Sequence, residues 1–199
     1  RSMADIEMVR EVRKVVGDDL PMYCDANSRY SETEARTIFS RLADYNITFI
    51  EDPCNFKSHD RMALMAQALP VAILGDTDCE TAALTQELIK LNAVGGVSIK
   101  MRRTGVTESL QIIGMCEAAG LPNVVGTDSE SRIATMSRMH LRAAIPSLAN
   151  LPTETHFYDK LADDCFEGEF EFNKGLITVP DTPGFGAAID EKKLKKYQV

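Results

Sequence analysis

Three acidic residues and one lysine occur at nearly equal spacing along the first half of the chain. Asp25, Glu51, Asp76 and Lys100 are 26, 25 and 24 residues apart, and each ends a short run of apolar residues. Such runs, separated by helical patterns, are typical of repeated βα units. The C-terminal ends of parallel barrel strands converge on one mouth, where active sites lie. We therefore expect these four side chains to meet.

Three carboxylates at neighbouring strand ends repel one another unless a cation lies between them. Oxygen ligands favour a hard divalent ion, so Asp25, Glu51 and Asp76 are predicted to bind Mg²⁺, with Mn²⁺ as the second choice. Such an ion can bind a substrate carboxylate and stabilise the enediolate that forms when the α-proton leaves. Lys100 is the candidate base, and burial beside a cation is expected to lower its pKa.

Other charged residues near these positions have supporting roles. Arg102 and Arg103 add positive potential beside Lys100, and one of them is expected to pair with the substrate or with an acidic residue. Asp52 is a candidate for holding the metal ligands in place. A lone acidic residue at a strand end is more often a helix cap or a surface charge. The prediction therefore depends on four residues occurring in phase.

Composition limits the classes of function. The chain has 199 residues, enough for one domain with a core, and its formal net charge of −8 argues against a nucleic-acid partner. No apolar run approaches the roughly 20 residues of a membrane helix, so no membrane partner is expected. Five scattered cysteines without a CxxC pair indicate free thiols and a reducing, cytoplasmic location. Buried thiols are favoured over a thiolate metal site.

The pattern of elements predicts an α/β fold, a TIM-type (β/α) barrel that is incomplete at the N-terminus. The expected strands are 22–25, 47–51, 71–74, 96–101, 123–125 and 151–155, and the expected helices are 6–16, 31–44, 59–69, 81–91, 105–119 and 132–144. A closed barrel has eight of each, so two units are expected before residue 1. An open barrel with exposed strand edges is expected to associate, which favours a homo-oligomer.

Residues 166–199 differ from the partial barrel of residues 1–165. Glu169–Phe172 and Leu176–Val179 alternate polar and apolar residues around the turn Asn173-Lys174-Gly175, which predicts a hairpin. The basic run 192–196 is expected to be a solvated terminal helix. We expect this tail to pack on the barrel or on a further domain.

Six short motifs occur in the chain in a specific order. They are Cys24-Asp25-Ala26-Asn27, Ile50-Glu51-Asp52-Pro53, Gly75-Asp76, Ser98-Ile99-Lys100, residues 125–133 (VGTDSESRI) and residues 179–186 (VPDTPGFG). In these motifs and their order the chain resembles the mandelate racemase and muconate-lactonising group of the enolase superfamily. The resemblance covers nearly the whole chain.

The resemblance implies a (β/α)7β-type barrel whose third, fourth and fifth strands carry the three Mg²⁺ ligands, with Lys100 as the base at the sixth. It also implies that Asn27 is the polar partner of the first ligand. Glu130 matches an acidic residue that contacts the substrate or orients a catalytic group, and Arg102 is a further candidate for substrate binding. One departure is Thr77, which stands where the family usually has Glu.

A second departure concerns the N-terminal part of the family. Members begin with an α+β capping domain and two further strands, the second of which carries a Lys-x-Lys motif. The chain is therefore expected to be the C-terminal part of an enzyme, with the N-terminal part of the same enzyme as a partner.

The leading hypothesis is Mg²⁺-dependent abstraction of the α-proton of a small carboxylate substrate. The product would be a racemate or epimer, a cycloisomer or a dehydrated acid. One alternative is a barrel aldolase in which Lys100 forms a Schiff base. Another is a non-catalytic fragment of a larger enzyme.

Overall fold

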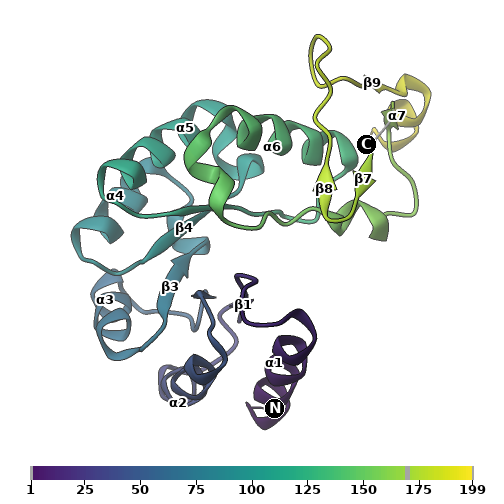
Figure 1. Cartoon of the computed structure of the whole chain (residues 1–199). Coiled ribbons are helices and arrows are strands. Elements are labelled where there is room, and N and C mark those ends of the chain that lie inside the picture. Colours follow the sequence, from purple (N-terminus) through teal and green to yellow (C-terminus); the bar gives the residue numbers. More distant parts are fainter. Residues whose placement is uncertain (1, 169–170, 199) are drawn as a thin grey trace.

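A curved parallel sheet with helices on its convex side forms most of the computed structural model, which describes residues 2–168 and 171–198 (Figure 1). The strands of this sheet are β1 (Tyr23–Asp25), β2 (Phe49–Glu51), β3 (Ala72–Gly75), β4 (Gly96–Ile99) and β5 (Asn123–Val125). The helices that accompany it are α1 (Ser2–Val16), α2 (Glu32–Leu42), α3 (His59–Ala68), α4 (Ala82–Lys90), α5 (Met101–Ala118) and α6 (Arg132–Ala144).

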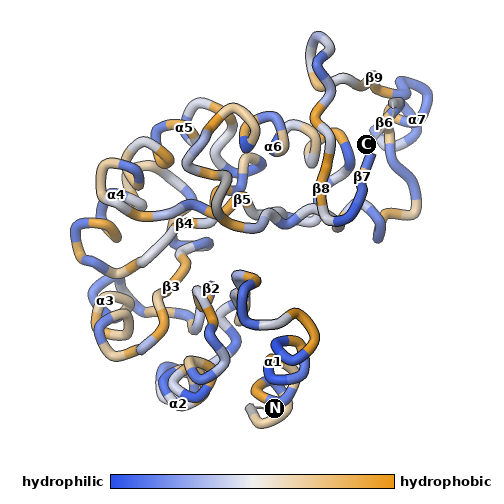
Figure 2. Tube along the Cα trace, viewed as in Figure 1, coloured by the Kyte–Doolittle hydropathy of each residue, from blue (hydrophilic) through white to orange (hydrophobic). Residues whose placement is uncertain are grey.

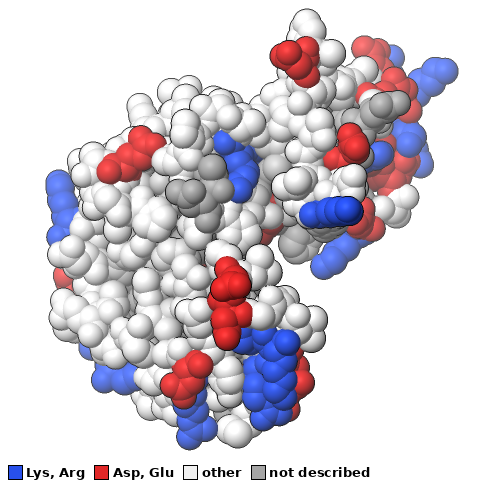
Figure 3. Space-filling view, viewed as in Figure 1, with Lys and Arg blue, Asp and Glu red and all other residues white. Residues whose placement is uncertain are grey.

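The topology is that of half a barrel. The strands lie in the order β1-β2-β3-β4-β5, all neighbours are parallel, and one helix connects each strand to the next. The concave side of the sheet opens toward the right in Figure 1, and Figure 3 shows the surface hollowed there, with acidic side chains at its edge. The predicted incomplete TIM-type barrel is confirmed.

Side chains alternate between the two faces of the sheet, as the pleat requires. Ile50 and Ile73 face the helices and join the main core, whereas Phe49, Leu74 and Val124 form a second buried cluster on the concave face. Figure 2 shows hydrophobic residues along β2 and β3. Residues two positions beyond this inner cluster therefore also face the barrel interior.

Several helix ends are set by sequence signals. Ser31 and Glu34 form a capping box at the start of α2. Gly17 and Gly120 follow α1 and α5 with positive φ, as is common after helix C-termini. Within the described ranges, no helix has both the length and the apolar character needed to cross a membrane.

Two predicted strands differ from the structure. The strand predicted over 96–101 ends at Ile99, because Met101 already begins a helical turn that is interrupted at Gly105. The sixth strand predicted over 151–155 was wrong, since these residues have no strand conformation. Glu154 N does donate to Val125 O over 3.3 Å, so the segment runs beside β5 without forming a ladder.

The tail carries short antiparallel pairs. β7 (Phe172–Asn173) and β8 (Leu176–Ile177) form the predicted hairpin around Lys174 and Gly175, while β6 (Phe166–Glu167) pairs with β9 (Ala188–Ile189). Part of the predicted first hairpin strand, residues 169–170, lies outside the described residues. The basic run belongs to the exposed helix α7 (Glu191–Tyr197). The division of the chain near residue 165 stays a prediction.

Helix α1 presents an unusual apolar stripe to solvent. Met8, Val12 and Val15 are exposed, whereas Val9 and Arg13 on the opposite side are buried against the rest of the molecule. We predict that this stripe is a contact surface between copies of the chain.

We expect Val15→Lys to reduce self-association of the chain, as measured by sedimentation velocity, and to change the free energy of unfolding by less than about 0.5 kcal/mol. Val15 is 86% exposed and Val9 is 5% exposed, so Val9→Ala is the buried control. It should destabilise the chain by about 1–3 kcal/mol. Unchanged association in Val15→Lys would show that the stripe is not a contact surface.

Candidate functional site

The Lys100 ammonium lies among carboxylates at the C-terminal edge of the sheet. Its Nζ is 2.6 Å from Asp76 Oδ2, 3.7 Å from Glu51 Oε1 and 4.0 Å from Asp128 Oδ1. Asp25 stands beside Glu51 in the register of β1 and β2. Four side chains spaced along 76 residues are thus gathered at one end of the half-barrel, as the equal spacing predicted.

Glu51 is the most confined member of this group. The residue is fully buried, and neither carboxylate oxygen has a hydrogen-bond partner among the described residues. Burial, together with the charge of Asp25, raises the pKa of Glu51 to about 8, although Lys100 opposes the shift. A buried carboxylate with unused oxygens needs a cationic partner to remain ionised at neutral pH.

Asp25 is oriented by the residue that the resemblance pairs with it. Asn27 donates to both Asp25 oxygens, from its backbone N over 2.7 Å and from Nδ2 over 2.6 Å. Asn27 and the following Ser28 have positive φ, so the chain turns sharply here. Burial raises the pKa of Asp25 despite these bonds. In this arrangement Asn27 fixes a candidate ligand.

Asp52 organises the turn that carries Asp76. Its side chain accepts hydrogen bonds from Asp76 N, over 3.2 Å, and from Thr77 N and Thr77 Oγ1, over 3.3 and 2.6 Å. Asp52 itself has a positive φ of 39°. Thr77, the departure from the family pattern, thus becomes a donor to the supporting carboxylate.

Arg103 bridges two carboxylates and extends the charge network. Its Nη1 is 3.0 Å from Asp76 Oδ1, and its Nη2 is 2.9 Å from Asp128 Oδ1. Asp128, which occurs in the motif of residues 125–133, also contacts Arg102 over 3.3 Å. Burial raises the pKa of Asp128, but the Arg103 hydrogen bond and charge outweigh it and leave this pKa below its usual value. Arg103 therefore has the acidic pairing expected of one of the two arginines.

The carboxylates around Lys100 raise its pKa. Burial lowers it, but the hydrogen bond to Asp76 and the charges of Asp76, Glu51 and Glu154 outweigh burial and raise it. The expected lowering of this pKa depends on a neighbouring cation and stays a prediction, whereas the surrounding carboxylates by themselves favour the charged ammonium. Burial also keeps the pKa of Asp76 above its ordinary value despite two cationic partners.

Glu130 is held by a residue that the sequence argument did not consider. Arg138 Nε lies 2.7 Å from Glu130 Oε2, and both side chains are buried. Thr127 Oγ1 also donates to Glu130, over 3.2 Å. Glu130 and Arg102 line a common groove of about 470 Å³ next to α5 and α6, so these two predicted substrate-binding residues do come together.

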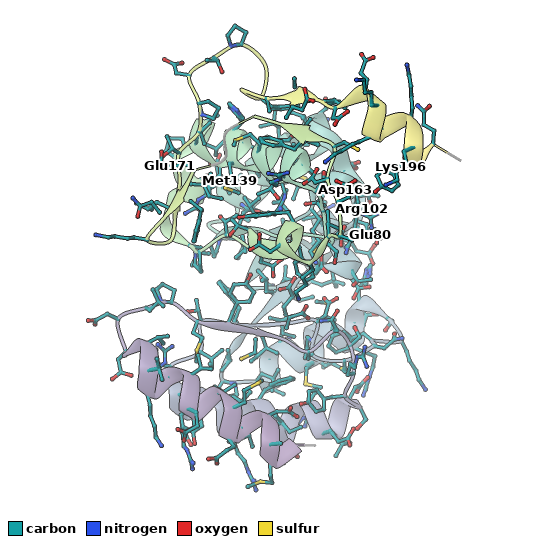
Figure 4. All side chains as sticks on the ribbon, turned by 90° about the vertical axis from the view of Figure 1, so that its right-hand side faces the viewer. Glu80, Arg102, Met139, Asp163, Glu171 and Lys196 are labelled. Atoms are coloured by element: carbon teal, nitrogen blue, oxygen red, sulfur yellow. The ribbon has the colours of Figure 1, made fainter. Side chains whose placement is uncertain are left out.

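Arg102 and Asn27 belong to different surfaces. The Arg102 side chain is 64% exposed at the rim, and Figure 4 places it with Glu80 on one side of the molecule, opposite Met139. Asn27 and Asp25 line a separate cavity of about 790 Å³ beside α1 and α2. The predicted substrate-binding residues therefore do not form one pocket in the described part of the chain.

Glu154 is a site residue that the sequence argument missed. Tyr23 Oη donates to Glu154 Oε1 over 3.1 Å, and Thr127 N donates to Oε2 over 2.8 Å. This carboxylate links the first strand of the sheet to the loop after the last one. Burial and the charge of Glu154 raise the pKa of Tyr23 well above its usual value, so the phenol remains a donor. The sequence predicted a strand at 151–155 that includes Glu154, and no motif in that segment indicated a site residue.

The donor set fits a hard divalent cation. Asp25, Glu51 and Asp76 supply only carboxylate oxygens, and the unpartnered oxygens of buried Glu51 are available to an ion. Over the described ranges, no group of three His, Cys, Asp or Glu side chains is placed to hold a metal ion. In this arrangement Asp76 is engaged by Lys100 and Arg103, while Asp25 is engaged by Asn27.

Comparison with known proteins agrees with this arrangement. A family model described as enolase C-terminal domain-like matches residues 2–193. Muconate cycloisomerase 1-1 of Acinetobacter lwoffii is 29% identical over 97% of this chain and 50% of its own length. Arabinonate dehydratase of Saccharolobus solfataricus is 31% identical over 98% of this chain and 52% of its own length.

A solved structure has the same fold over nearly the whole chain. The dipeptide epimerase of Cytophaga hutchinsonii, in complex with Mg and the dipeptide D-Ala-L-Val, superposes with a TM-score of 0.87 and 26% identity. The match covers 98% of this chain and 53% of that chain. The chain thus spans about half the length of the relatives it matches.

We expect Glu51→Gln to stabilise the metal-free chain at neutral and higher pH. Because the folded-state pKa of Glu51 is raised to about 8 from its ordinary value of 4.5, the unfolded state releases this proton first as pH rises. Wild-type stability should therefore fall as pH rises between these values, by at most about 1.4 kcal/mol per pH unit.

Urea unfolding at pH 5, 6, 7 and 8 measures this difference. The gap between Glu51→Gln and the wild type should widen with pH, whereas the exposed control Glu117→Gln should show no widening. A constant gap would contradict the buried, unpartnered state of Glu51.

Proposed function

Because the chain belongs to the enolase C-terminal domain-like family, within the mandelate racemase and muconate-lactonising group, we propose that it carries the metal ligands and one base of an α-proton-abstracting enzyme. The substrate would be a small molecule with a carboxylate. The observation that supports this most directly is the Lys100 ammonium, 2.6 Å from Asp76 and 3.7 Å from the unpartnered carboxylate of Glu51.

Lys100 is the proposed general base. It projects from the end of β4 into the concave side, where the bound substrate would lie, and its amine is the only lysine nitrogen paired with this carboxylate group in the described residues. In the arrangement seen here the amine is protonated and bound to Asp76. Neutralisation of the carboxylate charges would remove the interactions that raise its pKa, leaving burial to lower it.

Asp25, Glu51 and Asp76 are the proposed ligands of a Mg²⁺ ion, with Mn²⁺ as the substitute. When bound, this ion would stabilise negative charge on the substrate carboxylate. Asn27 and Asp52 hold the first and third ligands through the hydrogen bonds described above. Arg102 and Glu130 are proposed to contact the substrate beside α5 and α6.

The relatives indicate the range of reactions rather than one substrate. Their names describe a cycloisomerase, a dehydratase and an epimerase, and a common step of α-proton removal would serve all three. We propose that an N-terminal portion supplies the rest of the mouth, since the relatives are about twice as long as this chain. We also propose that copies of the chain associate. A cytoplasmic location is proposed as well, because free thiols favour a reducing compartment.

The metal assignment predicts specific losses in titration calorimetry. Mg²⁺ should bind the wild-type chain, and Glu51→Gln or Asp76→Asn should weaken binding by about 100-fold or more, because each removes a ligand charge. Glu117→Gln is the exposed acidic control and should bind as the wild type does. Equal affinity in all four proteins would overturn the ligand assignment.

The base assignment predicts that Lys100→Ala reduces exchange of the substrate α-proton with solvent deuterium by roughly 10²–10⁴-fold while Mg²⁺ binding is retained. NMR measures the exchange, in protein that includes the proposed N-terminal portion. Exchange at the normal rate would exclude Lys100 as the base. Covalent trapping of Lys100 by substrate and borohydride, with activity unaffected by a chelator, would instead indicate Schiff-base chemistry.

A further inference from the structure

Gly126 lies directly after β5, on the concave side of the sheet and against the side chain of Lys100. A Cβ atom at this position would lie 2.5 Å from Ser98 Oγ, 2.9 Å from Lys100 Cε and 3.4 Å from Lys100 Cγ. Favourable contacts between carbon atoms are about 3.5–4.0 Å, so a methyl group does not fit without displacing a neighbour. The φ of Gly126 is not in the left-handed region. Glycine is therefore needed here because a side chain would not fit, and not because of its backbone conformation.

The backbone of Gly126 is held on both sides. Its N–H donates to Ile99 O over 3.0 Å, and its carbonyl accepts from Arg138 Nη1 over 2.8 Å. Arg138 is only 1% exposed, and the same Nη1 also donates to Glu154 O over 2.8 Å. Movement of Gly126 away from β4 would break these buried hydrogen bonds, so the backbone is the costlier part to displace.

Lys100 is therefore the group that would move. Its carbonyl accepts hydrogen bonds from Arg103 N and Thr104 N, which fix the main chain at the start of α5. Its ammonium reaches Asp76 at the other end. The aliphatic part between these two fixed ends passes over Gly126, and a shift of Cε would carry Nζ with it.

We propose that Gly126, held between Ile99 and Arg138, is a positioning residue that sets where the Lys100 ammonium lies among the carboxylates. Its consequence for catalysis rests on the proposed function of Lys100 as the base. The placement of the ammonium does not depend on that function and can be measured by itself.

Trace acetylation followed by peptide mass spectrometry measures the placement. In the wild type, buried Lys100 should react more slowly than exposed Lys90, which serves as the internal reference. In Gly126→Ala the reactivity of Lys100 relative to Lys90 should rise severalfold, because the ammonium no longer reaches Asp76. Gly114→Ala is the matched control, since a Cβ there meets nothing within 4 Å. An unchanged ratio in folded Gly126→Ala would overturn the proposal.

Kinetics measure the consequence in protein that includes the proposed N-terminal portion. Gly126→Ala should lower kcat for α-proton exchange by about 10–100-fold while KM and Mg²⁺ affinity change by less than about twofold. A loss confined to KM or to metal binding would contradict the positioning role. If the wild type exchanges no α-proton with any carboxylate, the proposed function fails, and the labelling result still decides the placement.

A second variant covers the case in which Gly126→Ala does not fold. Adding Ser98→Ala removes the oxygen of the 2.5 Å contact and leaves the 2.9 Å contact with Lys100 Cε. The double variant should show the same raised Lys100 reactivity, and wild-type reactivity in it would overturn the proposal.

Discussion

The concentration of like charge at one end of the sheet is the constraint on which this site depends. Asp25, Glu51 and Asp76 end three adjacent strands, and Glu51 has no access to water. Buried carboxylates are unfavourable unless cations or hydrogen bonds compensate them. Lys100 and Arg103 provide that compensation for buried Asp76, and Asn27 donates to the more exposed Asp25, but Glu51 has no hydrogen bond and only the Lys100 ammonium at 3.7 Å. The incomplete compensation at Glu51 is the observation that supports the proposed cation site.

The fold creates this constraint through a simple alternation. On the concave face an apolar layer that includes Phe49 and Leu74 lies one step below a charged layer that includes Glu51 and Asp76. The apolar layer closes the interior from beneath, which deprives the charged layer of water. Directly beyond the strand ends, Asn27, Ser28, Asp52 and Ser129 have positive φ. Conformations of this kind cost about 1–3 kcal/mol each and persist where the surrounding structure demands them, commonly at functional sites.

The sequence predicted what depends on periodicity and failed where a tertiary contact decides. Five strands, six helices and the convergence of Lys100 with the carboxylates follow from regular spacing and local caps, and the structure contains them. The segment at 151–155 was predicted to be a strand, but it forms no strand ladder. Instead, Arg138 donates to the Glu154 carbonyl and Thr127 N donates to the Glu154 carboxylate. Glu130 pairs with Arg138, which lies eight residues further along the chain on α6, and no local sequence pattern indicates this pairing.

The state of Lys100 shows how the charge network and the proposed chemistry are related. Two of the carboxylates that raise its pKa, Asp76 and Glu51, are also proposed metal ligands, so the ammonium and a divalent cation would share these oxygens. Competition of this kind couples the two: each positive charge weakens the binding of the other. A lysine that lost its carboxylate partners would retain only the effect of burial, which favours the neutral amine. The interactions that keep Lys100 protonated here are thus the ones that the proposed metal site would have to replace for Lys100 to act as the proposed base.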